Sequence, residues 1–382
     1  MRILHMADAH FGRRFASSRF GAESARKRRG ALEDALRLMV QYCNENAVDV
    51  ILCAGDLIES GEIRPSDLRA LEEILSGLTR ARMVCVSGNH DPLDASSAYN
   101  RLKCHQLTIL PSGYDPLDAS SAYNRLKCER LTILPPGYSR TMLDGDTALH
   151  AYSFPEAVQR SNPLEALTLD MSAPKNLLML HCDAISPESD YLPARMAFLK
   201  QFDYCALGHV HQPLHLSPGV RYSGSLIGLD RNETGPRGFV VIDLDGVVSD
   251  RFVPLPIPTY ENLTVELPAG LSDGAVERRV LEALEPLPAF NLYSVTLTGT
   301  HTAGARPDAE TITERLRNSG HAVYLIDQTR PAYDLEALSQ EHRDDLIGQI
   351  IASFGAEDVL SEKDSLALEY ALTALMEGGR KA

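Results

Sequence analysis

The chain has 382 residues, of which 44% are hydrophobic, and this is enough for one large core and a smaller companion domain. Its formal net charge of −15 argues against a protein coated in cations for non-specific binding to nucleic acid. No apolar run approaches the eighteen or so residues that a membrane span needs, so we expect no membrane partner.

The cysteines and the N-terminus predict a cytoplasmic location. The seven cysteines include no Cys-x-x-Cys pair and fall mostly inside apolar segments, which is typical of reduced, buried thiols. The chain enters its first apolar strand at residue 2, so we expect no signal peptide.

In chain order, the first part alternates apolar strands with amphipathic helices. Strands are expected at 2–7, 48–54 and 83–86, and helices over about 24–46 and 65–78. Because consecutive parallel strands are joined by crossover helices, this order predicts a largely parallel α/β sheet covered by helices.

An internal duplication follows the third strand. Residues 91–114 are repeated almost verbatim as 115–138, which indicates a recent duplication rather than a solenoid, and we assign it no catalytic role. The end of the second copy, 131–134, leads directly to the next strand at 147–153 and is expected to enter the sheet. The surplus is then expected to be a surface excursion of about 96–119.

The next part is richer in strands. Strands are expected at 176–181 and 203–208 with a helix over 194–201 between them, and the short runs between 214 and 253 are expected to pair as antiparallel hairpins. The proline-rich residues 254–258 predict a stiff connector and a domain boundary.

This boundary gives three predicted parts. Residues 1–255 form the first domain, and residues 256–331 alternate strands and helices as a small α+β domain. Residues 332–382 form an acidic helical segment whose apolar faces either pack internally or bind a partner.

Five of the predicted strands end in residues that commonly bind metals. Because ligands bind at the carboxyl ends of strands in open α/β sheets, we expect these residues to share one site. In chain order the strand ends carry Asp8 and His10, Asp56, Asn89 with His90 and Asp91, His181, and finally His209 and His211.

The spacing of these residues suits a pair of metals. Asp8 and His10 are two apart, so they point to the same side of a strand, and His209 and His211 repeat that spacing. The carboxylate of Asp56 can bridge two cations. Nitrogen and oxygen ligands without thiolate suit Mn²⁺, Fe or Zn²⁺ and argue against Ca²⁺ or a closed structural zinc site. Two such metals clamp the oxygens of an in-line phosphoryl displacement.

His90 and Asp91 are candidate catalytic residues. His90 follows the candidate ligand Asn89 and is free to protonate a leaving oxygen, with Asp91 as an orienting partner. Each motif alone is weak, because a Gly-Asp pair usually marks a turn and a lone histidine is usually structural. Five of the twelve histidines nevertheless fall at strand ends with these partners, and the set predicts a dinuclear centre.

A basic cluster lies just downstream of the first motif. It is either a solvated surface or a region that steers phosphate groups towards the site, and the sequence leaves both readings open. Its members are Arg13, Arg14, Arg19, Arg26, Lys27, Arg28 and Arg29.

These motifs resemble those of the calcineurin-like metallophosphoesterases, and more narrowly the SbcD component of the SbcCD exonuclease and its YhaO-like DNA-repair-exonuclease relatives. Residues 231–238 look like the YhaO-like branch. The resemblance implies an α/β fold, a β-sandwich of mixed sheets covered by helices, with a smaller C-terminal α+β capping domain. It covers about 1–255 by motifs and extends more weakly over the following small domain.

The resemblance also implies roles for the site residues. Asp8, His10, Asp56 and His211 would hold one metal, Asp56, Asn89, His181 and His209 the other, and His90 would be the catalytic imidazole. The metals would be two divalent transition ions, Mn²⁺ first, with Fe or Zn²⁺ as alternatives. The sequence departs from the family motif at Glu59, because nuclease members often carry a histidine three residues after the bridging aspartate. The substitution bears on how the DNA end is handled.

Three functions follow. The leading one is a metal-dependent DNA exonuclease or endonuclease subunit in DNA repair, working with an SMC-like ATPase of the SbcC kind. The second is a phosphodiesterase or phosphatase for a small phosphate ester, which the acidic total charge favours. The third is a catalytically silent scaffold for the ATPase. The presence of every candidate ligand and of His90 argues against this third function. The oligomeric state, a homodimer among the options, and the strand polarity stay open.

Overall fold

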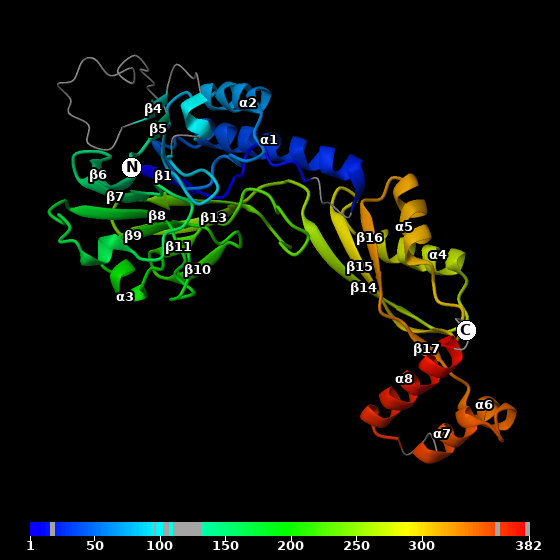
Figure 1. Cartoon of the computed structure of the whole chain (residues 1–382). Coiled ribbons are helices and arrows are strands. Elements are labelled where there is room, and N and C mark those ends of the chain that lie inside the picture. The colour runs from blue at the N-terminus through cyan, green and yellow to red at the C-terminus, as the bar shows by residue number, and fades with distance from the viewer. Residues whose placement is uncertain (16–19, 95–96, 102–106, 110–130, 356–359, 379–382) are drawn as a thin grey trace. The chain divides into compact units, whose positions relative to one another are not determined.

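Residues 1–15, 20–94, 97–101, 107–109, 131–355 and 360–378 are described by the structure, which is a computed structural model (Figure 1). The chain forms two compact units, Met1–Tyr260 and Glu261–Ala382. Among the helices of the described ranges, none combines the length and the apolar character that crossing a bilayer requires.

The first unit contains two mixed sheets. The first sheet has seven strands in the order β13-β12-β1-β2-β3-β5-β4, and its last five in that order run parallel. β12 pairs antiparallel with β1, and β13 with β12. The strands are β1 (Arg2–Met6), β2 (Val50–Ala54), β3 (Arg82–Val86), β4 (Leu107–Ile109), β5 (Leu131–Ile133), β12 (Gly238–Asp243) and β13 (Ser249–Pro254).

The second sheet has six strands in the order β10-β11-β9-β8-β7-β6. Its four central strands are parallel, and β10 and β6 close the two edges antiparallel. The strands are β6 (Gly137–Met142), β7 (Thr147–Ser153), β8 (Lys175–His181), β9 (Tyr204–Gly208), β10 (Leu214–Ser217) and β11 (Val220–Tyr222). The expected fold class, an α/β metallophosphoesterase-type sandwich of mixed sheets, is therefore confirmed.

Side chains of β1 and of Ala7, the residue after it, alternate between two cores. Ile3 and Ala7 join the core between the two sheets, whereas Leu4 and Met6 join the core beneath the helices α1 (Gly21–Glu45) and α2 (Pro65–Ser76). This is the two-residue period of a strand that is buried on both faces, and it explains why the strand reads as a continuous apolar run. The helices cover one face of the first sheet and leave its strand ends free for the site.

The helix α2 begins where the sequence predicts. Pro65 occupies its first turn, where a missing N–H is harmless, and the Asp67 side chain accepts a hydrogen bond of 2.8 Å from the Arg64 backbone N–H. The expected helix over 194–201 is shorter than predicted, since α3 spans Met196–Leu199.

The duplicated strands lie side by side. β5 pairs with β3, as expected for the second copy, and β4 adds one further strand outside β5. Leu107 faces Leu131 and Ile109 faces Ile133, so the two copies pair with an offset of 131 − 107 = 24 residues, which is the repeat length. Two identical sequences thus occupy adjacent positions in one sheet.

The first copy also contributes to the core. Ala98 and Tyr99 are fully buried, and the Tyr99 hydroxyl donates a hydrogen bond to Asp91. The expected surface excursion of 96–119 is therefore wrong at its start, because the chain returns to the core at Ala98. Its residues 96, 102–106 and 110–119 lie outside the described residues.

The second unit has a smaller sheet with two helices packed on it. β14 (Tyr260–Leu267), β15 (Leu292–Thr302) and β16 (Val323–Asp327) are neighbours in that order, and β15 and β16 are parallel. β17 (Arg330–Ala332) pairs in parallel with the last three residues of β15. The helices α4 (Asp273–Leu284) and α5 (Ala309–Asn318) supply apolar side chains to its core. The helices α6 (Leu335–Glu341), α7 (Leu346–Phe354) and α8 (Glu362–Gly378) follow. The division of this unit near residue 331 stays a prediction.

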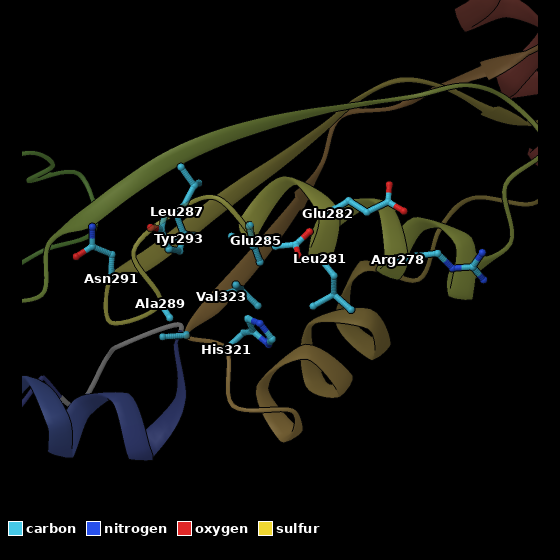
Figure 2. A pocket seen from close by; sticks show the side chains of 12 residues that line it. Arg278, Leu281, Glu282, Glu285, Leu287, Ala289, Asn291, Tyr293, His321 and Val323 are labelled. Carbon is cyan, nitrogen blue, oxygen red and sulfur yellow. The ribbon is translucent and has the colours of Figure 1, made fainter.

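A cavity of about 390 Å³ lies in the second unit (Figure 2). Leu281, Leu287 and Val323 form part of its largely apolar wall, and His321 contributes an imidazole. All of its lining residues fall between Arg278 and Val323, so it is formed within this unit. It offers a single histidine, whereas the strand ends of the first unit gather five.

Candidate metal centre

The candidate ligands come from strand ends that the fold brings together. β1, β2 and β3 are parallel neighbours in the first sheet, and β8 and β9 are parallel neighbours in the second. Backbone hydrogen bonds continue past the strand ends, with Asp8 N–H donating to the Gly55 carbonyl at 3.1 Å and His10 N–H to the Asp56 carbonyl at 2.9 Å. The loops that carry the ligands are therefore fixed to one another.

Backbone strain concentrates at the same place. Seven non-glycine residues of the described part have a positive φ, and four of them are candidate ligands: Asp8 (52°), His10 (45°), Asp56 (51°) and His209 (99°). Left-handed backbone is uncommon for residues with a Cβ, and strained residues of this kind cluster at functional sites. The fold holds these four residues in a conformation that their side chains disfavour.

Gly88, which follows β3, allows the end of that strand to approach the ends of β2 and β8. A Cβ at this position would lie 2.8 Å from the ring of His181 and would also overlap the carboxylate of Asp56. Since a Cβ essentially never comes within 3.0 Å of another heavy atom, only glycine fits here. This explains why the motif begins with glycine before Asn89.

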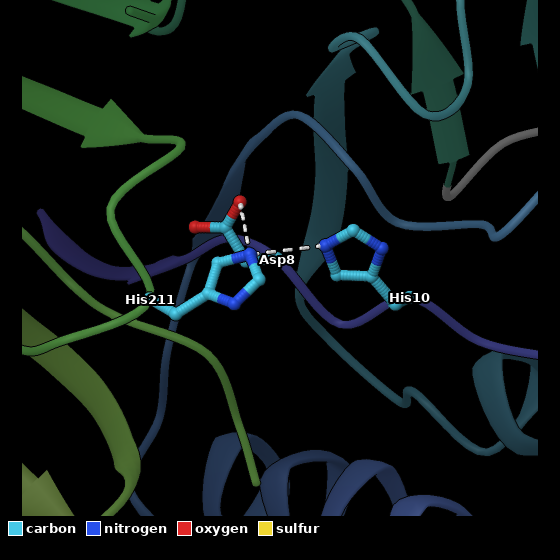
Figure 3. Close-up of side chains that lie close together, drawn as sticks. All are labelled: Asp8, His10 and His211. Carbon is cyan, nitrogen blue, oxygen red and sulfur yellow. Dashed lines mark hydrogen bonds and ion pairs between the residues drawn. The ribbon is translucent and has the colours of Figure 1, made fainter. Parts of the chain in front are cut away.

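Asp8, His10 and His211 form one half of the centre (Figure 3). Nε2 of His10 lies 3.3 Å from Nε2 of His211, and Nε2 of His211 lies 4.0 Å from Oδ1 of Asp8. The ligand atoms of the three residues lie within 4.8 Å of one another, which is close enough to hold one ion.

Asp56, His181 and Asn89 belong to the other half. Nε2 of His181 lies 3.4 Å from Oδ2 of Asp56 and 2.8 Å from Oδ1 of Asn89. The same Oδ2 of Asp56 lies 3.6 Å from Nε2 of His10, so Asp56 stands between the two halves. The ring of His209 lies 5.3 Å from that of His181, and burial together with His181 lowers the pKa of His209 to about 4.

The chemistry of these contacts fits bound cations. Nδ1 of His10 and Nδ1 of His211 each face a glutamate oxygen, so each carries its hydrogen on Nδ1. When both rings are neutral, their Nε2 lone pairs then face each other across 3.3 Å. Nε2 of His181 faces the acceptor oxygen of Asp56 in the same way, because its Nδ1 lies 3.1 Å from the Ala54 carbonyl. Nitrogen and oxygen atoms that converge in this way can coordinate a metal ion.

Two glutamates orient the histidines: Glu59, which the sequence linked only to the handling of the DNA end, and Glu233, to which it gave no role. Oε2 of Glu59 lies 3.0 Å from Nδ1 of His10, and Oε1 of Glu233 lies 2.7 Å from Nδ1 of His211. Burial alone would raise the pKa of Glu59, but its hydrogen bonds from His10 and His90 outweigh burial and hold that pKa below the usual value. Such carboxylates fix the tautomer and the orientation of metal-binding histidines.

His90 lies at the open side of the centre. Its side chain is 40% exposed, its Nδ1 lies 2.9 Å from Oε1 of Glu59, and its backbone N–H donates to Oδ1 of Asp56 at 2.8 Å. The hydrogen bond to Glu59 raises the pKa of His90. One nitrogen of His10, one of His90 and one oxygen of Asp56 also lie within 4.8 Å of one another.

Asp91 supports the loop that carries Asp56. It accepts hydrogen bonds from the N–H groups of Asp56 and Ile58, both at 3.2 Å, and from that of Gly88 at 2.6 Å. Burial and the neighbouring charge of Asp56 raise the pKa of Asp91 to about 7. Within the described residues, the side-chain contact that orients His90 comes from Glu59 rather than from Asp91.

Arg28 of the basic cluster is part of the fold. Its side chain is 1% exposed, donates to the backbone carbonyls of Gly228 and, at 2.6 Å, Pro258, and lies 4.7 Å from the ring centre of Tyr260. These contacts leave it no part in binding an external phosphate. Arg19 lies outside the described residues.

Arg14 and Arg13 differ in their freedom. Arg14 donates to the side chain of Asp67 and to the backbone of Glu62, so its guanidinium is engaged. Arg13 is 31% exposed and its Nη1 lies 3.7 Å from Oε2 of Glu59, at the edge of the centre. Arg13 therefore lies beside the centre, whereas Arg14 is held by Asp67 and Glu62.

Comparison with known proteins gives the same picture. The family described as calcineurin-like phosphoesterase matches residues 1–213, which include every candidate metal ligand. The SbcD component of the nuclease SbcCD of Rhodobacter capsulatus is 30% identical over 298 residues, which cover 68% of this chain and 70% of that protein. The DNA double-strand break repair protein Mre11 of Methanopyrus kandleri is 26% identical over 272 residues, covering 66% of this chain and 56% of that protein.

A solved dimetal phosphatase from Danio rerio aligns with 68% of this chain and 99% of its own length, with 13% identity and a TM-score of 0.36. The family match spans more than half of the chain and contains the converging aspartates and histidines described above. The chain belongs to the calcineurin-like metallophosphoesterases and is related to the SbcD and Mre11 nucleases.

Proposed function

We propose that this protein is a metal-dependent DNA nuclease that hydrolyses phosphodiester bonds in DNA repair. The observation that carries the proposal is the convergence of two aspartates and three histidines with His90 beside them, in a chain similar to a nuclease component over two thirds of its length. The converging residues are Asp8, Asp56, His10, His181 and His211. The family resemblance supplies the proposed partner, an SMC-like ATPase. It also suggests that residues 256–331 of this chain form a capping domain, which the helical segment 332–382 follows. We place the protein in the cytoplasm because the cysteines within the described residues are free thiols and buried.

In this proposal the centre holds two divalent transition ions. Asp8, His10, Asp56 and His211 bind one ion, and Asp56, Asn89, His181 and His209 bind the other, with Mn²⁺ as the metal that we propose. Bound there, the ions would neutralise phosphate charge and make a hydroxide available near neutral pH. The donor set, nitrogen and oxygen without thiolate, suits this choice.

The residues around the ions have separate tasks. His90 donates a proton to the leaving oxygen of the phosphodiester, since its exposed side faces the open edge of the centre. Glu59 accepts the Nδ1 hydrogen of His90 and so leaves Nε2 free to act on the substrate. Arg13, at the same edge, binds a neighbouring phosphate.

A second candidate is a phosphodiesterase or phosphatase for a small phosphate ester. Two arginines of the basic cluster, Arg14 and Arg28, are engaged within the fold and are not available to a DNA backbone. The net charge of −15 also disfavours a long polyanion. A small ester needs only the centre and Arg13.

One comparison separates these functions. The purified full chain is given Mn²⁺ and either labelled DNA or bis-p-nitrophenyl phosphate, with Asp56→Asn as the control. Degradation of DNA by the wild type and not by the variant supports the nuclease. Hydrolysis of the small ester alone supports the second candidate. A protein that binds two metals but hydrolyses neither substrate is a scaffold.

A further inference from the structure

The two halves of the centre differ in the hydrogen-bond acceptors that face the Nδ1 atoms of their histidines. His10 and His211 each donate an Nδ1 hydrogen to a carboxylate, Glu59 at 3.0 Å and Glu233 at 2.7 Å. In the other half, Nδ1 of His181 faces a neutral backbone carbonyl at 3.1 Å. A carboxylate partner increases the basicity of an imidazole and fixes its orientation, and a carbonyl does so less.

The negative charge is divided just as unequally. Beyond the shared Asp56, the half that contains His10 and His211 has the carboxylate of Asp8 as a ligand and those of Glu59 and Glu233 one residue further out. The other half has the neutral amide of Asn89, and Asp8 is close to it as well, with Oδ1 3.9 Å from Nδ1 of His181. The difference in charge between the halves therefore comes from Glu59 and Glu233. A divalent cation in the first half therefore meets more negative charge at short range.

Glu233 is held in place by the loop that carries it. Its second oxygen, Oε2, accepts the Leu229 N–H at 2.8 Å. The buried side chain of Arg237 donates to the backbone carbonyl of His211 and, at 3.2 Å, to that of Thr234. The loop thus hydrogen-bonds both the ring and the backbone of His211, so the ring is oriented before an ion binds.

We propose that Glu59 and Glu233 make the Asp8–His10–His211 site the tighter of the two metal sites, so that it fills first and the Asn89–His181–His209 site fills second. The inference rests on the dinuclear centre of the proposed function. Preorientation of both histidines and the greater negative charge act in the same direction. Glu233 is a positioning residue that acts through His211.

The test is a titration of the metal-free full chain with Mn²⁺ alone, with free Mn²⁺ followed by electron paramagnetic resonance. We expect two resolved binding steps in the wild type. Glu233→Gln keeps an acceptor oxygen for His211 but removes the charge, and it should weaken the tighter step by about 10–100-fold while leaving the weaker step unchanged. Asp230→Asn is the matched control, because Asp230 is an exposed residue of the same loop whose carboxylate accepts from the Asn232 N–H.

A second variant assigns the steps. Asn89→Ala should remove the weaker step and keep the tighter one. Two steps of equal affinity in the wild type, a tight step that Glu233→Gln leaves intact, or loss of the tight step in Asn89→Ala would each overturn the inference while leaving the dinuclear centre in place. Folded wild-type protein that binds no Mn²⁺ would instead overturn the proposed function itself.

Discussion

Glu59 holds His90 by a single contact, with Oε1 of the glutamate 2.9 Å from Nδ1 of the histidine. The other oxygen of the same carboxylate lies 3.0 Å from Nδ1 of His10. One side chain therefore sets the orientation of a candidate metal ligand and of the candidate proton donor. A substitution at His90 should consequently lower the rate of hydrolysis alone, whereas a substitution at a ligand should lower both metal binding and the rate.

The first prediction concerns His90. His90→Gln should leave Mn²⁺ binding near normal and lower the rate of hydrolysis by about 10²–10⁴-fold, the usual loss when a general acid is removed. Metal content and the rate on bis-p-nitrophenyl phosphate are measured on the same preparation. If metal content falls in parallel with the rate, His90 is a ligand and not the proton donor.

The second prediction concerns the shared ligand. Asp56 lies 3.4 Å from His181 and 3.6 Å from His10, so Asp56→Asn should reduce binding of both ions and abolish hydrolysis. Asp8→Asn should weaken mainly one ion. Elemental analysis of metal-loaded protein measures both effects, and a wild type that never exceeds one metal per chain would contradict the dinuclear centre.

The third prediction separates two adjacent arginines. Arg13→Ala should weaken DNA binding on all sequences and flatten the dependence of log K on log salt by about 0.9, the value for one phosphate contact on duplex DNA. Arg14→Ala is the control, because Arg14 is engaged with Asp67 and should leave the salt dependence unchanged. An unchanged salt dependence in Arg13→Ala would mean that Arg13 is a solvated surface residue that contacts no phosphate.

The fourth prediction concerns the duplication. Deleting residues 91–114 joins His90 to Asp115, and Ser121, Ala122 and Tyr123 then stand where Ser97, Ala98 and Tyr99 stood. The variant should fold with equal stability, bind two ions and keep its activity, because only the outermost strand β4 is lost and shortening a loop costs little closure entropy.

Deleting 115–138 is the matched control for that variant, since it leaves a chain that differs from the first at three positions only. The two should have the same melting temperature and metal content. An insoluble or metal-free product from both deletions would mean that two copies are needed to complete the sheet.

The strand ends were predictable because their signals are local. An apolar run that stops at Gly55-Asp56 or at Gly88-Asn89 places a polar group at a sheet edge whatever the rest of the chain does. The parallel order of β1, β2 and β3 then brings those groups together. The same reasoning gave most strands and helices within a few residues of their observed bounds.

Glu59 and Glu233 could not be assigned in this way. Glu59 contacts a histidine 49 residues away and Glu233 one that is 22 residues away, and no local pattern reports such a contact. Arg28 is different. It precedes Leu32 by four residues and Ala35 by seven, so helical periodicity already places it on the buried face of α1.

The duplicated strands show another limit. Leu107–Ile109 and Leu131–Ile133 have the same sequence, so no propensity or pattern distinguishes the one that pairs with β3 from the one at the edge. The length of chain that leads from each strand to the next element decided in favour of the second copy. Tyr99 was expected to need cover, but its burial in the core of the first unit could not be assigned to it rather than to Tyr123, because both have the same neighbours in sequence.

The left-handed backbone at the four candidate ligands sets activity against stability. Strain of this kind costs about 1–3 kcal/mol at each residue, against about 5–15 kcal/mol for the unfolding of a whole domain. Glycine at position 8 or 10 would release that strain and lose a ligand. A chain under selection for folding alone would be expected to drift towards such substitutions. Asp8→Gly or His10→Gly should therefore stabilise the metal-free chain and weaken metal binding, so that folding and metal binding place opposite demands on these positions.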